Sequence, residues 1–127
     1  MPEGWRDRLI NPILSLVVEA ALDKKAEDLA ILDLTQHGSI TDYFIICHGR
    51  SARQVQAISD SVAMKLKEAK VRRGHVEGYA AGAWVLMDYG DFIVHIFTDE
   101  KRNYYDLDRL WSDAPRLKDA GKSRKNS

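Results

Sequence analysis

Apolar residues are densest near the middle of the chain, where two short runs flank a turn. The first run, Trp84–Asp88, opens on a tryptophan, and the second, Phe92–Phe97, is apolar at nearly every position. Runs of this length and composition predict two strands joined as a hairpin. A strand without polar alternation is expected to be buried on both faces. The rest of the chain must therefore supply helices that cover this hairpin.

The dipeptide Tyr89-Gly90 between the two runs predicts a two-residue loop. With that loop, Trp84 faces His95 across the pair and Asp88 faces Asp91. A tryptophan at a strand edge beside small residues and acids is typical of an interaction hot spot, although packing in the core explains it equally well. The two aspartates are explained better by turn chemistry than by a catalytic acid and base.

Helical periodicity marks the segments on either side of a first pair of strands. Asn11-Pro12 predicts a helix start, with apolar residues recurring up to Leu22. Ser51–Gln54 has the pattern of a capping box, and a one-sided helix of about five turns follows it. Thr98 or Asp99 can cap a short helix through Tyr104.

A last short helix is predicted to begin at Asp106 and to carry Leu107, Leu110 and Trp111 until Pro115 stops it. The three remaining apolar runs predict further strands over 29–34, 43–47 and 75–77.

This order predicts one α/β domain with a mixed sheet of about five strands, flanked by helices. The long helix is expected to join the strands over 43–47 and 75–77 in parallel. The domain is expected to span residues 1–114, followed by a basic, disordered tail over 115–127.

Composition and length are those of a single soluble domain. The chain has 127 residues, 45% of them hydrophobic and 30% charged. No apolar run approaches the roughly 20 residues that a membrane span needs. The N-terminus lacks the pattern of a signal peptide, and the lone cysteine, Cys47, suits a reducing compartment. We therefore expect a cytoplasmic protein.

A net charge of zero conceals an uneven distribution. The segment from Pro115 onward has five basic residues and one acid, whereas the first 114 residues have 14 basic and 18 acidic side chains. An acidic body does not predict binding to a nucleic-acid backbone and suits a basic protein partner, although an acidic solvated surface explains it equally well. The basic tail makes ribosomal RNA a candidate contact for that segment alone.

Reactive chemistry finds little support. Cys47 and His48 are neighbours on a strand, so their side chains point to opposite faces and cannot pair. His95 is better explained as a packed core histidine than as a proton carrier. The histidines and acids form no metal-ligand pattern, so no cofactor or metal is expected.

The alternative function is a nucleotide-binding or nucleotidyl-transferring enzyme. Gly49-Arg50-Ser51 before a helix is a candidate anion site. Such enzymes need two close carboxylates on the following strand to hold magnesium, and the strand over 75–77 offers only Glu77. The loop over 78–82 lacks the ending of a phosphate-binding loop and is interpreted as a flexible loop that leaves Trp84 accessible.

A set of motifs lies between Leu14 and Ala114, namely Asp23–Asp28, Thr41–Phe44, Ser51–Val55, Val76–Gly78, Trp84–Asp91, Val94–Phe97, Arg102, and Tyr105–Leu107 through Leu110-Trp111. With these motifs the chain closely resembles the ribosome silencing factor family, also called Iojap. The chain departs from the family pattern at Cys47–Arg50 and after Pro115.

The resemblance implies a nucleotidyltransferase-like fold without catalytic carboxylates, and a protein that is not an enzyme. It implies a translational repressor that binds the large ribosomal subunit through ribosomal protein L fourteen and blocks joining of the small subunit when nutrients are scarce. Aid to large-subunit assembly and formation of a homodimer are further expectations. By motif, the implied partner-binding residues are Glu77, Trp84, Asp88, Asp91, Arg102 and Tyr105.

Overall fold

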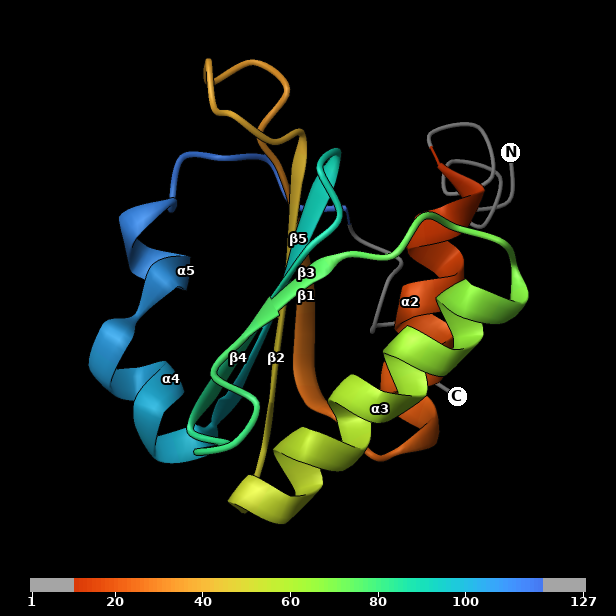
Figure 1. Ribbon diagram of the computed structural model, residues 1–127. Coiled ribbons are helices and arrows are strands. Elements are labelled where there is room, and N and C mark those ends of the chain that lie inside the picture. The colour runs from red at the N-terminus through yellow and green to blue at the C-terminus, as the bar shows by residue number, and fades with distance from the viewer. Residues whose placement is uncertain (1–10, 118–127) are drawn as a thin grey trace, which may run out of the picture.

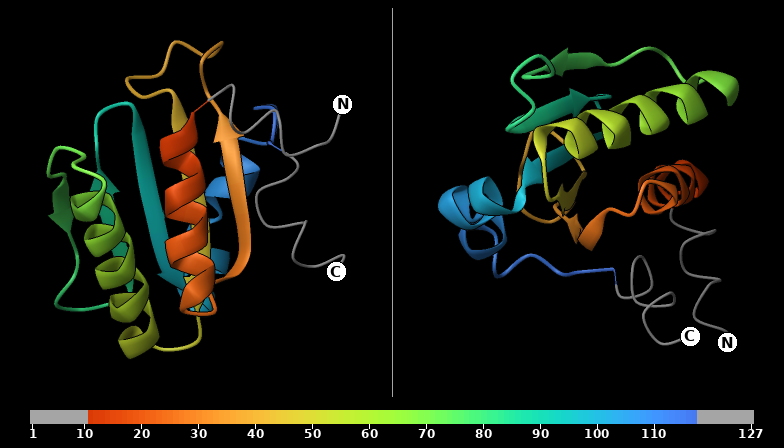
Figure 2. Two further views of the ribbon diagram at one scale, coloured as in Figure 1. Left: turned by 90° about the vertical axis from the view of Figure 1, so that its right-hand side faces the viewer. Right: turned by 90° about the horizontal axis from the view of Figure 1, so that it is seen from below.

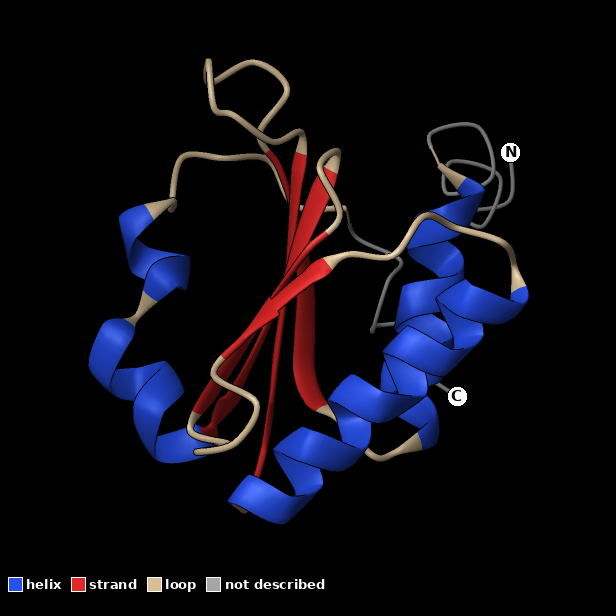
Figure 3. Cartoon of the chain, in the orientation of Figure 1, coloured by secondary structure: helices blue, strands red, loops and turns tan. Residues whose placement is uncertain are grey.

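The computed structural model describes residues 11–117, which form three layers: two helices, a sheet, and two shorter helices (Figures 1 and 3). In chain order the elements are α2 (Pro12–Asp23), β1 (Glu27–Asp33), β2 (Tyr43–Gly49), α3 (Ala52–Glu68), β3 (His75–Glu77), β4 (Trp84–Asp88), β5 (Phe92–Thr98), α4 (Asp99–Tyr105) and α5 (Leu107–Leu110). The prediction of a mixed five-stranded sheet flanked by helices is confirmed.

The sheet separates two apolar cores. Helices α2 and α3 cover one face, and α4 and α5 lie on the other, as the view from below shows (Figure 2). The larger core lies under α2 and α3 and contains Val55, Ile58 and Val62 of α3. The smaller core contains Phe97 and Leu32 and is packed against by Trp111.

Caps predicted from the sequence hold the two long helices. Asn11 accepts a hydrogen bond from the backbone N–H of Ile13 at 2.9 Å, and Pro12 occupies the first turn. Ser51 accepts from the N–H of Gln54 at 3.1 Å. The reciprocal bond differs from the predicted capping box, because Gln54 Oε1 accepts from the N–H of Arg50, one residue before the cap, at 2.8 Å.

The predicted hairpin register is wrong by two residues. Trp84 pairs with Phe97, and Asp88 pairs with Ile93, not with Asp91. The N–H of Tyr89 donates to the carbonyl of Phe92 at 3.0 Å, so the two-residue loop lies one position later than predicted, over residues 90–91. The reason is the glycine, since its φ of +90° fits the first central position of a type II′ turn.

The strands over 43–47 and 75–77 run parallel within one sheet, as predicted, but they are not neighbours. The strand order is β1-β2-β5-β4-β3, so β5 lies parallel beside β2, and β3 is an edge strand antiparallel to β4. The strand that is apolar at nearly every position thus takes the centre of the sheet, where neighbouring strands pair with both of its edges.

The C-terminal segment differs from its prediction in two respects. Asp106 does not cap α5 with its side chain; it has φ +50° and ends α4, its N–H donating to the carbonyl of Arg102. Beyond the predicted boundary at Ala114, Arg116 forms a bridge with Leu32 of β1. The remainder of the predicted basic tail, 118–127, lies outside the described residues.

Two glycines test whether the backbone beside Trp84 excludes a side chain, because Gly78 lies beside Trp84 and Gly90 lies in the hairpin turn at the other end of β4. Gly78 and Gly90 both have positive φ, but only at Gly78 would an added Cβ meet an obstacle, the carbonyl oxygen of Trp84. We expect Gly90→Ala to lower the free energy of unfolding by about 1–2 kcal/mol, the cost of a left-handed alanine. Gly78→Ala should cost clearly more. Urea denaturation of both variants checks this, and equal losses would contradict the predicted clash.

Candidate functional site

The sheet face opposite α2 and α3 is only partly covered. Strand alternation points Val85 and Met87 into the larger core and turns Trp84, Leu86 and Asp88 to this opposite face. The latter three side chains are half-buried. Helix α4 packs on β5 and β2, so the half of the face formed by β4 and β3 is left without a helix (Figure 2).

A continuous line of aromatic rings crosses this face, and we call it the aromatic row. Its members are Tyr104, Tyr105, Trp84, His95, Phe44 and Trp111, each within 6 Å of the next by ring centroids. The row begins on α4, crosses β4, β5 and β2, and ends just beyond α5. It therefore joins the open half of the face to the half that α4 and α5 cover.

Trp84 lies where the row passes from surface to core. Its ring stacks on Phe97 at 4.9 Å and contacts Tyr105 at 4.6 Å. Its indole Nε1–H donates to Nδ1 of His95 at 3.2 Å. Trp84 is therefore half-buried. Its packing on Phe97 agrees with the interpretation as a core residue, and its remaining accessible surface is compatible with the interpretation as an interaction hot spot.

The outer end of the row is its most exposed part. Tyr104 is 75% exposed and Leu110 is 71% exposed. Together with Asn103, Tyr105, Asp106 and Arg109 they line a shallow hollow of about 540 Å³. The sequence places Tyr104 and Leu110 on predicted short helices, but it did not predict that they form the exposed end of an aromatic surface. Consecutive helical residues point about 100° apart, so two neighbouring tyrosines do not both face the sheet, which is a usable signal.

Arg102 is an internal anchor. Its side chain is 12% exposed, and its guanidinium binds both carboxylate oxygens of Asp108, at 3.1 and 3.2 Å. It also donates to the carbonyl of Asp28 at 2.7 Å and lies 3.0 Å from Nδ1 of His48. These contacts tie α4 and α5 to the ends of β1 and β2 and so hold Tyr105 against Trp84.

The predicted acidic residues are spread over the face and its rim. Register places Glu77 opposite Leu86, on the same face as Trp84, where it lies 2.7 Å from a ring nitrogen of His75. Asp88 shares this face, and its carboxylate accepts from the N–H of Gly90 at 2.9 Å, as turn chemistry predicts. Asp91 is exposed in the turn, at the end of β4 away from Trp84.

Cys47 and His48 point to opposite sides of the sheet, as predicted. Cys47 lies in the larger core, and burial raises the pKa of its thiol to about 12, so it is a thiol at neutral pH. His48 is buried on the other side between Arg102 and Glu27. His95 is packed within the aromatic row, as predicted, and burial lowers its pKa to about 4.

The donors of the candidate anion site at Gly49-Arg50-Ser51 already have partners within the chain. The Arg50 guanidinium forms a salt bridge with Glu27 at 2.8 Å, and the backbone N–H of Arg50 donates to Oε1 of Gln54. Within residues 11–117, no group of three or more His, Cys, Asp or Glu side chains could hold a metal ion. None of the helices seen in this range is long and apolar enough to cross a membrane.

The loop over 78–82 is tethered, which contradicts the prediction of a flexible loop. Gln56 of α3 donates to the carbonyls of Tyr79 and Ala80 at 2.9 and 3.2 Å. The hydroxyl of Tyr79 donates to Asp60 at 3.0 Å. These bonds exist because the loop packs back on α3, which sequence periodicity does not reveal.

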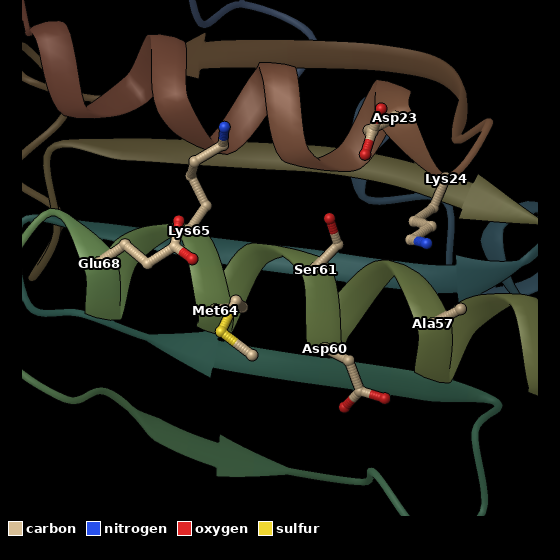
Figure 4. A pocket seen from close by; sticks show the side chains of 8 residues that line it. All are labelled: Asp23, Lys24, Ala57, Asp60, Ser61, Met64, Lys65 and Glu68. Carbon is tan, nitrogen blue, oxygen red and sulfur yellow. The ribbon is translucent and has the colours of Figure 1, made fainter.

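A second hollow lies on the far side of the sheet, between α2 and α3 (Figure 4). It has a volume of about 430 Å³ and is lined by Asp23, Lys24, Ala57, Asp60, Ser61, Met64, Lys65 and Glu68. Charges of both signs meet there, and Lys65 is paired with Glu19 at 2.6 Å. This mixture indicates a solvated groove with no preference for one ligand charge.

The fold and the aromatic row define a small α/β protein with a half-open aromatic face on a mixed sheet. A family model described as "Ribosomal silencing factor during starvation" matches residues 8–127. The Ribosomal silencing factor RsfS of Bacillus subtilis is 43% identical over 81% of this chain and 87% of its own length. The chain therefore belongs to the ribosomal silencing factor family, and its role lies in ribosome silencing, a form of translation regulation.

Solved structures agree with the assignment. A crystal structure of a Chromobacterium violaceum protein matches with a TM-score of 0.77 and 42% identity, over 80% of this chain and 84% of that one. A more distant mouse relative, named Mitochondrial assembly of ribosomal large subunit protein 1, is 28% identical over 78% of this chain and 45% of its own length.

The anchor role of Arg102 predicts a stability loss with a pH signature. Burial raises the pKa of Asp108, but the hydrogen bonds and charges of Arg102 and, less strongly, Arg116 together outweigh it and hold that pKa below its ordinary value. A carboxylate of this kind stabilises the fold above its unfolded pKa, and this contribution disappears as pH falls through the folded pKa. Arg102→Leu should lower the free energy of unfolding by roughly 3 kcal/mol at neutral pH. The variant should also lose less stability than wild type when the pH is lowered.

Arg109→Leu is the matched control, because it removes the same charge from an exposed site on α5. Its effect should stay within about 0.5 kcal/mol. Urea denaturation between about pH 7 and pH 3 compares the three proteins, a range that spans the ordinary carboxyl pKa. Equal losses of stability in the two variants would contradict the role of Arg102 in holding α4 and α5 in place.

Proposed function

We propose that this protein represses translation by binding the large ribosomal subunit through ribosomal protein L fourteen and blocking the small subunit. Membership of the ribosomal silencing factor family supports the ribosome as the target. The observation that carries the proposed surface is Trp84, a tryptophan only partly buried on a sheet face that α4 and α5 do not fully cover.

The composition of this surface suits a protein partner. Buried aromatic anchors surrounded by less critical polar contacts carry most of the energy of protein interfaces. Trp84, Tyr105 and Tyr104 supply the anchors, and Glu77 and Asp88 add negative charge on the same face. An acidic rim favours encounter with a basic partner, which a ribosomal protein provides.

The proposed action is steric and needs no catalytic turnover. A protein that covers part of the subunit interface blocks joining for as long as it stays bound, so its dissociation rate sets the strength of repression. We place this action in the cytoplasm. The name of the mouse relative supports a second role for this chain in large-subunit assembly.

A homodimer is part of the proposal. If two copies meet through the aromatic row, dimer formation and partner binding exclude each other, and repression then depends on protein concentration. Light scattering across a concentration series, with and without Trp84→Ala, measures this competition.

Substitution of Trp84 tests the binding surface. Trp84→Ala should lower the affinity for large subunits by at least about 30-fold, as measured by co-sedimentation. This loss corresponds to roughly 2 kcal/mol of binding free energy, which is typical of a hot spot. Since the ring also stacks on Phe97, this variant should lose about 1–3 kcal/mol of stability as well. Quantitative sedimentation with purified large subunits measures binding, and a thermal melt measures folding.

Met64→Ala provides the control, because it truncates a large exposed apolar side chain on α3, across the sheet from the proposed surface, and it should bind like wild type. Trp84→Phe keeps an aromatic ring for stacking on Phe97, and it should fold like the parent. Wild-type protein should accompany free large subunits and be absent from joined ribosomes. Binding by a folded Trp84→Ala protein at wild-type affinity would refute the proposed surface, and equal presence on joined ribosomes would refute the proposed block.

A further inference from the structure

His95 contacts Trp84 directly from the centre of the sheet. It lies on β5, is 4% exposed, and accepts the hydrogen bond from Trp84 Nε1–H at its Nδ1 atom. Phe44 packs edge-on against its ring at 4.5 Å. The imidazole is therefore held from two sides, by a ring of β2 and by the indole of β4, and has little freedom to turn.

The hydrogen bond determines which tautomer His95 adopts. An indole nitrogen only donates, so Nδ1 must be an unprotonated acceptor and Nε2 must carry the hydrogen. Nε2 is buried and has no hydrogen-bond partner among residues 11–117. A buried N–H without a partner lowers stability, and an apolar side chain of similar size would avoid that loss. The hydrogen bond from Trp84 is therefore the one polar contact in which this imidazole takes part among residues 11–117.

We propose that His95 is a positioning residue, whose Nδ1 holds the Trp84 indole in the orientation in which it meets its partner; this rests on the proposed function of Trp84. Stacking on Phe97 and the tilted contact with Tyr105 set the plane of the indole but do not distinguish the ring from its flipped form, which would carry Nε1 to the opposite edge. The bond to Nδ1 favours one of the two. A hot-spot side chain fixed before binding loses less conformational entropy when the complex forms.

Three substitutions separate this role from simple packing. His95→Asn keeps a carbonyl acceptor near the position of Nδ1. His95→Gln moves that carbonyl to the position of Nε2, and His95→Leu removes every acceptor. Asn and Gln are both amides, so their comparison isolates the place of the oxygen even if the Leu variant fails to fold.

The direct measurement is hydrogen exchange of the Trp84 indole N–H by NMR. The chain has three tryptophans, and Trp84→Phe identifies the resonance. His95→Gln and His95→Leu should speed its exchange by at least about tenfold, and His95→Asn should stay within about threefold of wild type. Unchanged exchange in folded Gln or Leu variants would overturn the proposal.

Affinity for large subunits supplies the second measurement. His95→Gln and His95→Leu should weaken binding about tenfold, whereas His95→Asn should bind nearly as well as wild type. The melting temperatures of the three variants should not follow the same ranking as their affinities. Faster indole exchange with unchanged affinity would refute the positioning role. A wild-type protein that does not bind large subunits would refute the proposed function, whereas indole exchange would still decide whether His95 orients Trp84.

Discussion

The buried central strand β5 is the constraint on which the rest of the structure depends. It pairs with β2 in parallel and with β4 in antiparallel, so both of its edges are hydrogen-bonded. Its alternation sends Val94 and Ile96 into the core under α2 and α3. His95 and Phe97 point to the other face, where they receive Trp84. The position of the proposed anchor therefore follows from how this one strand is buried.

The same face must serve both stability and recognition. Phe97 is fully buried beneath Trp84, while Tyr104 at the outer end of the aromatic row is largely exposed. Arg102 fixes α4, the short helix that carries both tyrosines, and its guanidinium makes internal contacts with Asp108 and the carbonyl of Asp28. The chain thus separates the residues that would meet a partner from those that hold them in place, although the motif groups them together.

Alternation explains why part of the site was predictable despite a wrong register. The hairpin is displaced by two residues from its predicted pairing, and a shift of two leaves every side chain on its original face. Trp84 and His95 therefore still meet, as diagonal neighbours that share a hydrogen bond. A shift of one residue would have sent Trp84 into the larger core.

The sequence was enough to predict the elements, the cap residues of α2, α3 and α4, and the face on which each strand residue lies, because these depend on neighbours within a few positions. The order of the strands and the partners of Arg102 were decided only by the tertiary structure. Arg102 contacts His48 and Asp28, 54 and 74 residues away, and β2 pairs with β5 across α3 and two other strands. Such contacts depend on how whole elements pack together, so the local spacing of residues in the chain does not predict them.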